Sequence, residues 1–204
     1  MVKRFFMALL LLVLILALCG CQRQAAVVNF SNELAKTEKL YSQKKMLHLQ
    51  QVVEYYDAAG NPLPRYFELF TADGKKTGYE LDAKGNVIQV YQDTKDRHIS
   101  YDLETLKAKE YDASPVFSID LALASKDKTR SIVKLEPYTY CGRACHVYGI
   151  LSDNEDENIK LYIDDETGYA LFCDTPLFCI KTASIEILPY DAGCFKIPED
   201  LIFE

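Results

Sequence analysis

The chain has 204 residues, with 23 lysines and arginines against 30 aspartates and glutamates, 49% apolar residues, seven cysteines and no tryptophan. This acidic balance excludes a nonspecific nucleic-acid-binding protein, which needs clustered basic residues to displace counterions. Aromatic and β-branched residues along the whole chain exclude an intrinsically disordered protein.

The N-terminus has the composition of a bacterial signal peptide. Lys3 and Arg4 precede an unbroken apolar run over residues 5–18. This run is shorter than the roughly 20 residues that a membrane-spanning helix needs, and it has the length of a signal-peptide core. We therefore predict that residues 1–20 are a signal peptide. The alternative is an uncleaved N-terminal anchor helix.

The four residues Leu18-Cys19-Gly20-Cys21 resemble a lipobox. Leu18 is at position −3, Gly20 at −1 and Cys21 at +1, whereas a cut before Cys19 would put Leu18 at −1. The resemblance implies cleavage between Gly20 and Cys21 and a diacylglyceryl group on the Cys21 thiol. Two or three acyl chains hold a protein stably on a membrane. We expect a lipid-anchored protein on the extracytoplasmic side of a bacterial membrane, with no cofactor besides this lipid.

Without the signal peptide, 184 residues with a net charge of −9 remain, which is enough for one domain with a proper core. We predict a lipidated tether over residues 21–28 and a single domain over residues 29–204. Asn29 or Ser31 can cap a helix that runs to about residue 44. Its apolar stripe contains Phe30, Leu34 and Tyr41, and the remaining positions, Glu33 among them, are polar.

After this helix the apolar residues recur with a period of two. Strands are predicted at 46–55, 65–70, 77–81, 87–91, 97–101 and 106–111, separated by turns that contain glycine beside aspartate or asparagine. Ser114-Pro115 is typical of the start of a second short helix, to about residue 125. Further strands are predicted at 131–135, 144–151, 159–163, 169–173 and 180–188, with a closing edge segment at 195–198.

These elements predict a mainly β (α+β) fold. About ten strands form one antiparallel sheet, which must bury one of its faces. Tyrosine and phenylalanine occur on both faces of several predicted strands, which ordinary packing explains. A sheet that curls around an apolar ligand would use the same residues.

Five cysteines remain after Cys19 is removed and Cys21 is lipidated, and they all lie in the last third of an exported chain. Local disulfides Cys141–Cys145 and Cys173–Cys179, with Cys194 unpaired, are the simplest arrangement, but the spacing leaves the connectivity open. Buried thiols are an alternative. A metal site formed by Cys141, Cys145, His146, Cys173 and Cys179 is another alternative, although the spacing fits no zinc knuckle.

No catalytic constellation is present in the sequence. Cys145 and His146 are adjacent, so on a strand their side chains point to opposite faces and cannot form a dyad. The acidic runs at 153–158 and 164–166 lack the glycine and spacing of an EF-hand loop, so solvated hairpin loops are preferred to calcium sites. We therefore expect neither an enzyme nor a metal protein.

Three stretches resemble the LolA/LolB-like superfamily of lipoprotein-sorting and lipid-carrying envelope proteins. They are Gly142–Tyr148, Leu161–Leu171 and Phe195–Pro198, and the order of helices and strands along the chain also agrees. The resemblance implies a strongly curved antiparallel half-barrel, with helices covering its open face over a cavity for acyl chains. It carries over no catalytic residue. The lipid anchor and the additional cysteines depart from the pattern of a soluble carrier.

Two functions follow as expectations. The first is a cell-envelope lipoprotein that binds a lipid or the acyl chain of a lipoprotein in the half-barrel cavity. The second is an anchored protein-interaction or regulatory module of the same fold without lipid cargo. The partners expected are therefore the membrane, a lipid or lipoprotein cargo, and no nucleic acid.

Overall fold

The computed structural model describes residues 30–94, 96–112, 121 and 130–204. The predicted signal peptide, the predicted lipidation site Cys21 and the tether lie outside the described residues. So does the predicted helix over residues 114–125, except Leu121, which is buried in the core.

The described residues form one helix of more than one turn and one sheet of twelve strands. The helix is α2 (Ser31–Ser42). The strands are β1 (Lys45–Tyr56), β2 (Pro62–Ala72), β3 (Lys75–Leu81), β4 (Val87–Asp93), β5 (His98–Tyr101), β6 (Lys107–Glu110), β7 (Ser131–Tyr140), β8 (Arg143–Leu151), β9 (Ile159–Asp164), β10 (Ala170–Asp174), β11 (Phe178–Pro189) and β12 (Ile202–Phe203). Short 3-10 helices, η1 (Glu155–Glu157) and η2 (Ala192–Phe195), occur in two connections.

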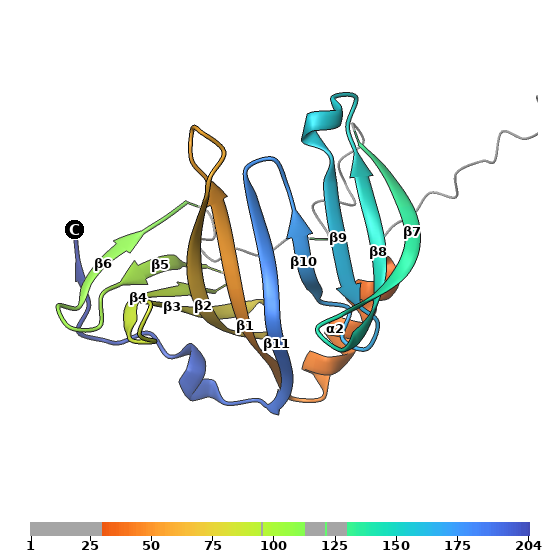
Figure 1. Ribbon diagram of the computed structural model, residues 1–204. Helices are drawn as coiled ribbons and strands as arrows, with labels where there is room; N and C mark the ends of the chain where they lie inside the picture. The colour runs from red at the N-terminus through yellow and green to blue at the C-terminus, as the bar shows by residue number, and fades with distance from the viewer. Residues whose placement is uncertain (1–29, 95, 113–120, 122–129) are drawn as a thin grey trace, which may run out of the picture.

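The sheet is open and strongly curved, as Figure 1 shows. Its strand order is β12-β6-β5-β4-β3-β2-β1-β11-β10-β9-β8-β7. The predicted mainly β, curved and largely antiparallel sheet is confirmed. The predicted closing edge segment is corrected: residues 192–195 form η2, and the edge strand is β12, which pairs in parallel with β6.

The strands are determined by the alternation of buried and exposed side chains and by turns that contain residues of positive φ. In β1, Leu47, Leu49 and Val53 are buried while Gln50 between them is exposed. The turn after β1 is held by Asp57, whose Oδ1 accepts hydrogen bonds from the backbone N–H groups of residues 59 and 61 at 2.8 Å each. The same aspartate arrangement recurs at Asp82 in the turn between β3 and β4.

Helix α2 begins differently from the prediction. Phe30 occupies the N-cap position, where its side chain makes no capping hydrogen bond. Its ring is instead fully buried and meets the ring of Tyr148 edge-on, with 5.0 Å between the centroids. The start of the helix is therefore fixed by burial of an aromatic ring.

The two halves of the sheet bury opposite faces. On β8 to β11, β1 and β2, the main apolar cluster lies on the concave face, where Phe30 and Leu121 pack against it. On β4 to β6, Val90, Ile99 and Ala108 belong to the other face and pack against Ile197 and Leu201 of the C-terminal segment. This segment runs from the end of β11 to the edge at β6, where the chain ends (Figure 1).

Candidate functional site

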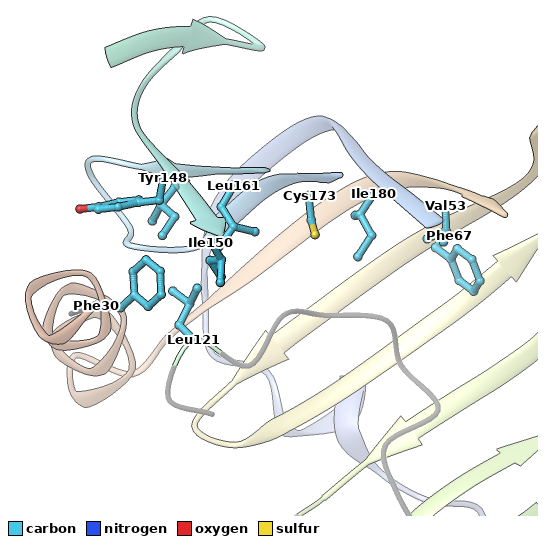
Figure 2. Packing of buried hydrophobic residues seen from close by; sticks show 10 residues of the cluster. Phe30, Val53, Phe67, Leu121, Tyr148, Ile150, Leu161, Cys173 and Ile180 are labelled. Atoms are coloured by element: carbon cyan, nitrogen blue, oxygen red, sulfur yellow. The ribbon is translucent and has the colours of Figure 1, made fainter. Parts of the chain in front are cut away.

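A cavity of about 300 Å³ lies between α2 and the concave face of the sheet. The residues that line it come from α2, from β1, β2, β3, β10 and β11, and from the β2–β3 and β9–β10 connections, together with Leu121. They are Leu34, Thr37, Tyr41, Gln51, Thr71, Gly74, Lys76, Leu121, Gly168, Tyr169, Ala170, Cys173 and Ile180. In Figure 2 Cys173, Ile180 and Val53 project from neighbouring strands to the same side of the sheet, the side on which Leu121 lies.

Several polar groups interrupt the apolar lining. Gln51 is 5% exposed, and its Nε2 donates a hydrogen bond to Oγ1 of the buried Thr182 at 3.0 Å. The hydroxyls of Tyr41 and Thr71 are 3.2 Å apart. The Tyr169 hydroxyl is buried and has no hydrogen-bond partner among the described residues. The lining of the cavity is therefore amphipathic rather than wholly apolar.

Helix α2 forms one wall of the cavity, and the buried carboxylate of Glu33 attaches this helix to β8. Glu33 is 3% exposed, accepts a hydrogen bond of 2.5 Å from the Tyr148 hydroxyl, and lies 3.2 Å from His146 Nδ1. Burial raises the pKa of Glu33, but the hydrogen bonds from Tyr148, from the backbone and from His146 outweigh it, so the pKa is lowered overall. Glu33 is therefore ionised at neutral pH, and the prediction that it lies on the polar side of the helix is wrong.

The β9–β10 hairpin supplies the other contact with α2. Arg143 pairs with both carboxylate oxygens of the buried Asp164 at 2.9 and 2.8 Å. Asp164 also accepts hydrogen bonds from the backbone N–H and the hydroxyl of Thr167. Thr167 in turn accepts a hydrogen bond of 2.8 Å at its carbonyl from the Thr37 hydroxyl of α2.

Gly168 is a point of close backbone approach between this hairpin and α2. Its φ is +69°, and a Cβ atom there would lie 1.9 Å from the backbone oxygen of Glu33. Only glycine fits this position without displacing the helix. The stretches that resemble the LolA/LolB-like superfamily therefore contain the residues that hold α2 over the sheet.

A second polar cluster lies on the concave face beyond the cavity. Arg65 pairs with Glu80, and its guanidinium donates a hydrogen bond of 2.7 Å to the Tyr91 hydroxyl. The Arg65 guanidinium also lies 5.3 Å from the ring centroid of Phe67. This cluster marks where the concave face changes from apolar on β1 and β2 to polar on β3 and β4.

The five cysteines of the described domain are free thiols. Cys173 is opposite Ile180 in the sheet and Cys179 is opposite Asp174, so the two cysteines point to opposite faces. Cys145 is buried in β8, whereas Cys141 is exposed in the β7–β8 turn. Neither of the predicted local pairs is formed in the structure. The pairing stays a prediction for the oxidised protein.

The residues considered as metal or calcium ligands either contact other groups or lie apart from one another. His146 contacts Glu33 while Cys173 lies in the cavity, and Asp164 is paired with Arg143. Within the described ranges, no group of three or more histidine, cysteine, aspartate or glutamate residues is arranged to hold a metal ion. In the same part of the chain, no helix is long and apolar enough to cross a membrane.

Sequence reasoning missed the polar residues of the cavity. Gln51 and Thr182 lie on the same face of their strands as the buried apolar residues, two positions from the nearest of them, so their burial follows from the strand period. Gly168 and Tyr169 lie within the stretch Leu161–Leu171 that resembles the superfamily, but no spacing in the sequence indicates that α2 lies against them.

Comparisons with known proteins show a shared fold at low sequence identity. No protein-family model and no curated protein matches the chain. A solved structure of MucB superposes with a TM-score of 0.53 at 14% identity, over 83% of this chain and 63% of that one. A structure of the Pseudomonas aeruginosa MucA/MucB complex matches with a TM-score of 0.53 at 13% identity, covering 81% of this chain. The match spans 60% of the length of the chain in that complex.

Two further solved structures extend this likeness. An uncharacterised conserved protein from Thermus thermophilus matches with a TM-score of 0.56 at 9% identity, over 85% of this chain and 98% of that one. A LolA superfamily protein from Nitrosomonas europaea matches with a TM-score of 0.43 at 5% identity, over 83% of this chain and 98% of that one. A LolA superfamily structure is thus among the matches, as the predicted resemblance implies, but at this TM-score it carries no argument about fold or function.

Proposed function

We propose that the protein is a lipid-anchored binding protein of a bacterial cell envelope that holds an acyl chain in the cavity beneath α2. The cavity itself carries this proposal. Its volume of about 300 Å³ is at the lower end of the range for small-molecule sites. Leu34, Ala170 and Ile180 give it the apolar walls that a hydrocarbon chain needs.

The direct test is to identify what the cavity contains. A protein that begins at Gln22 includes every residue that the structure describes, so it can be purified without a lipid anchor. Native mass spectrometry should show co-purified lipid that organic solvent removes. A protein that is empty after isolation, and that takes up no fatty acyl compound when one is added, would contradict the proposal.

Filling the cavity should prevent this uptake. Ala170→Trp puts a large ring into the lining, and we expect at least a tenfold loss of bound lipid. Ala83→Trp adds the same ring to the exposed turn between β3 and β4 and serves as the matched control. Equal lipid content in the two variants would place the lipid elsewhere.

The anchor is tested separately. We expect metabolic labelling with a palmitate analogue to mark the full-length protein through Cys21. Label that persists in Cys21→Ala would contradict the assignment of Cys21.

An anchored protein-interaction module is the second candidate, and an exposed aromatic surface favours it. Tyr138 is 55% exposed on the outer face, and its ring lies 5.2 Å from that of Tyr162, which stacks on Phe172 at 4.6 Å. Exposed apolar patches of this kind mark interaction sites. A photoreactive residue at Tyr138 should capture a protein in cells if this candidate holds, whereas one at the exposed Tyr66 should not.

A further inference from the structure

The cavity beneath α2 contains more hydrogen-bonding capacity than its own residues use. A side-chain amide has two donor hydrogens and two acceptor positions. Within the described part of the chain, the Gln51 amide makes one hydrogen bond, from Nε2 to Thr182. The amide oxygen and the second hydrogen therefore have no partner there, although Gln51 is 5% exposed.

Tyr169 does not add to this capacity. It lines the cavity, but its hydroxyl is buried away from the open space and has no partner among the residues that the structure describes. A hydrocarbon chain supplies no hydrogen-bond partner, so acyl-chain binding alone leaves the unused capacity of the Gln51 amide unexplained.

The volume limits the number of chains. About 300 Å³ is roughly twice the volume of a cavity of about 150 Å³ that holds one benzene molecule. One chain of moderate length fills this space, and a second chain would have to lie outside it.

We propose that the cavity binds a single-chain lipid whose ester carbonyl accepts a hydrogen bond from the Gln51 amide. The inference rests on the proposed function and specifies its ligand as a monoacylated glycerol ester. Leu34 and Ile180 contact the hydrocarbon chain. A free carboxylate placed against Gln51 fits less well, because burial of a charge beside a neutral amide carries a large desolvation cost; Lys76, the cation in the lining, makes laurate a necessary competitor in the test.

The test uses the full-length protein in nanodiscs of ether phospholipids, in which no lipid of the bilayer carries an ester. A monoacylglycerol with a diazirine on its chain is cross-linked by light, and the labelled peptides are identified by mass spectrometry. We expect label on the peptides that contain Leu34, Leu121, Ala170 or Ile180. Unlabelled monolauroylglycerol should compete about tenfold better than 1-O-dodecylglycerol, which differs by the carbonyl oxygen, and better than dilauroylglycerol or laurate.

Variants assign this preference to Gln51. Gln51→Leu should remove the preference for the ester over the ether and leave competition by the ether unchanged. Gln50→Leu changes the neighbouring, exposed glutamine and should keep the full preference. If Gln51→Leu fails to fold, Gln51→Met replaces it, because an unbranched side chain of similar length occupies the same space without an amide. That variant should likewise lose the preference for the ester.

The outcomes separate this inference from the proposed function. Equal competition by ester and ether, or by one chain and two, overturns the inference while acyl-chain binding stands. Stronger competition by laurate overturns it in favour of a carboxylate. If no probe labels the cavity peptides, both fall.

Discussion

Gly168 shows at the scale of one residue why the hairpin stretch has its particular sequence. The residue adopts a positive φ at the end of the β9–β10 turn, and its α-carbon lies where the backbone of α2 approaches closely. Asp164 accepts two hydrogen bonds from Thr167, and these fix the turn. The carbonyl of Thr167 accepts a third hydrogen bond from Thr37 of α2. The stretch therefore determines the position of the helix that covers the cavity.

Substitution of this glycine tests that role. We expect Gly168→Ala to lower the free energy of unfolding by roughly 3 kcal/mol or more, because a Cβ atom would collide with the Glu33 backbone. Gly85→Ala is the control: its φ is +86°, yet no described atom lies within 4 Å of the added Cβ. That change should cost about 1 kcal/mol. Urea denaturation measures both values, and equal losses would contradict the close contact.

The thiols provide a second test at the residue scale. Burial raises the pKa of Cys145 and of Cys179 to about 11 and raises that of Cys173 as well. At pH 8 these three residues hold little of the reactive thiolate form. We expect N-ethylmaleimide to modify Cys141 first and Cys194 next, and the other three only after unfolding, as measured by mass spectrometry. Cys141 that reacts only after reduction would instead reveal a disulfide.

At the scale of elements, α2 is attached to the sheet by charge as well as by apolar packing. Lys36 pairs with Asp165 at 2.5 Å, and Glu33 contacts His146 and Tyr148 of β8. These contacts join a helix near the start of the domain to strands more than a hundred residues later. Loss of the Glu33 charge should therefore loosen this helix specifically.

The stability of this attachment should depend on pH. The pKa of Glu33 is lower in the folded protein than its ordinary value of 4.5, so its contribution is present above about pH 4.5. It is lost as the pH falls through the lowered folded-state pKa. We expect Glu33→Gln to lower stability at pH 7 and to reduce its change between pH 6 and pH 3. Glu38→Gln, at an exposed site on the same helix, should leave the pH dependence unchanged.

At the scale of the whole molecule, the curved sheet needs cover on both faces. Phe30 and Leu121 cover the concave face of one half, while Ile197 and Leu201 cover the outer face of the other half. Phe195 packs against Met46 and stacks on Tyr190 with 5.7 Å between the ring centroids. The C-terminal segment is therefore part of the core.

Truncation tests this conclusion. A chain that ends at Tyr190 loses Phe195, Ile197 and Leu201, and we expect roughly 4 kcal/mol or more of lost stability, because each buried apolar side chain contributes about 1.5–3 kcal/mol. A chain that ends at Leu201 loses only the exposed Ile202 and Phe203 with the last residue, and should change little. Thermal unfolding distinguishes the two. Similar melting temperatures would show that the segment does not stabilise the sheet.

Local patterns explain which parts of the fold could be predicted. Alternation in β1 and the aspartate–glycine turns after β1 and β3 depend on neighbours in the sequence, and these elements occur where the sequence places them. The burial of Glu33 could not be predicted in this way, because its partners His146 and Tyr148 are 113 and 115 residues away. The position of Tyr169 against α2 was missed for the same reason, whereas the burial of Gln51 and Thr182 follows from the strand period.

The sequence by itself determined the strand-rich domain, its turns and the amphipathic helix before it, because each depends on periodicity and on residues within a few positions. It also predicts the lipidated Cys21 from a motif of four residues. Only the tertiary structure decided which face each half of the sheet buries, because curvature and the paths of α2 and the C-terminal segment set that choice. The same long-range packing places the Gln51 amide, held by Thr182, in the cavity beneath α2, and this placement specifies the ligand that we propose.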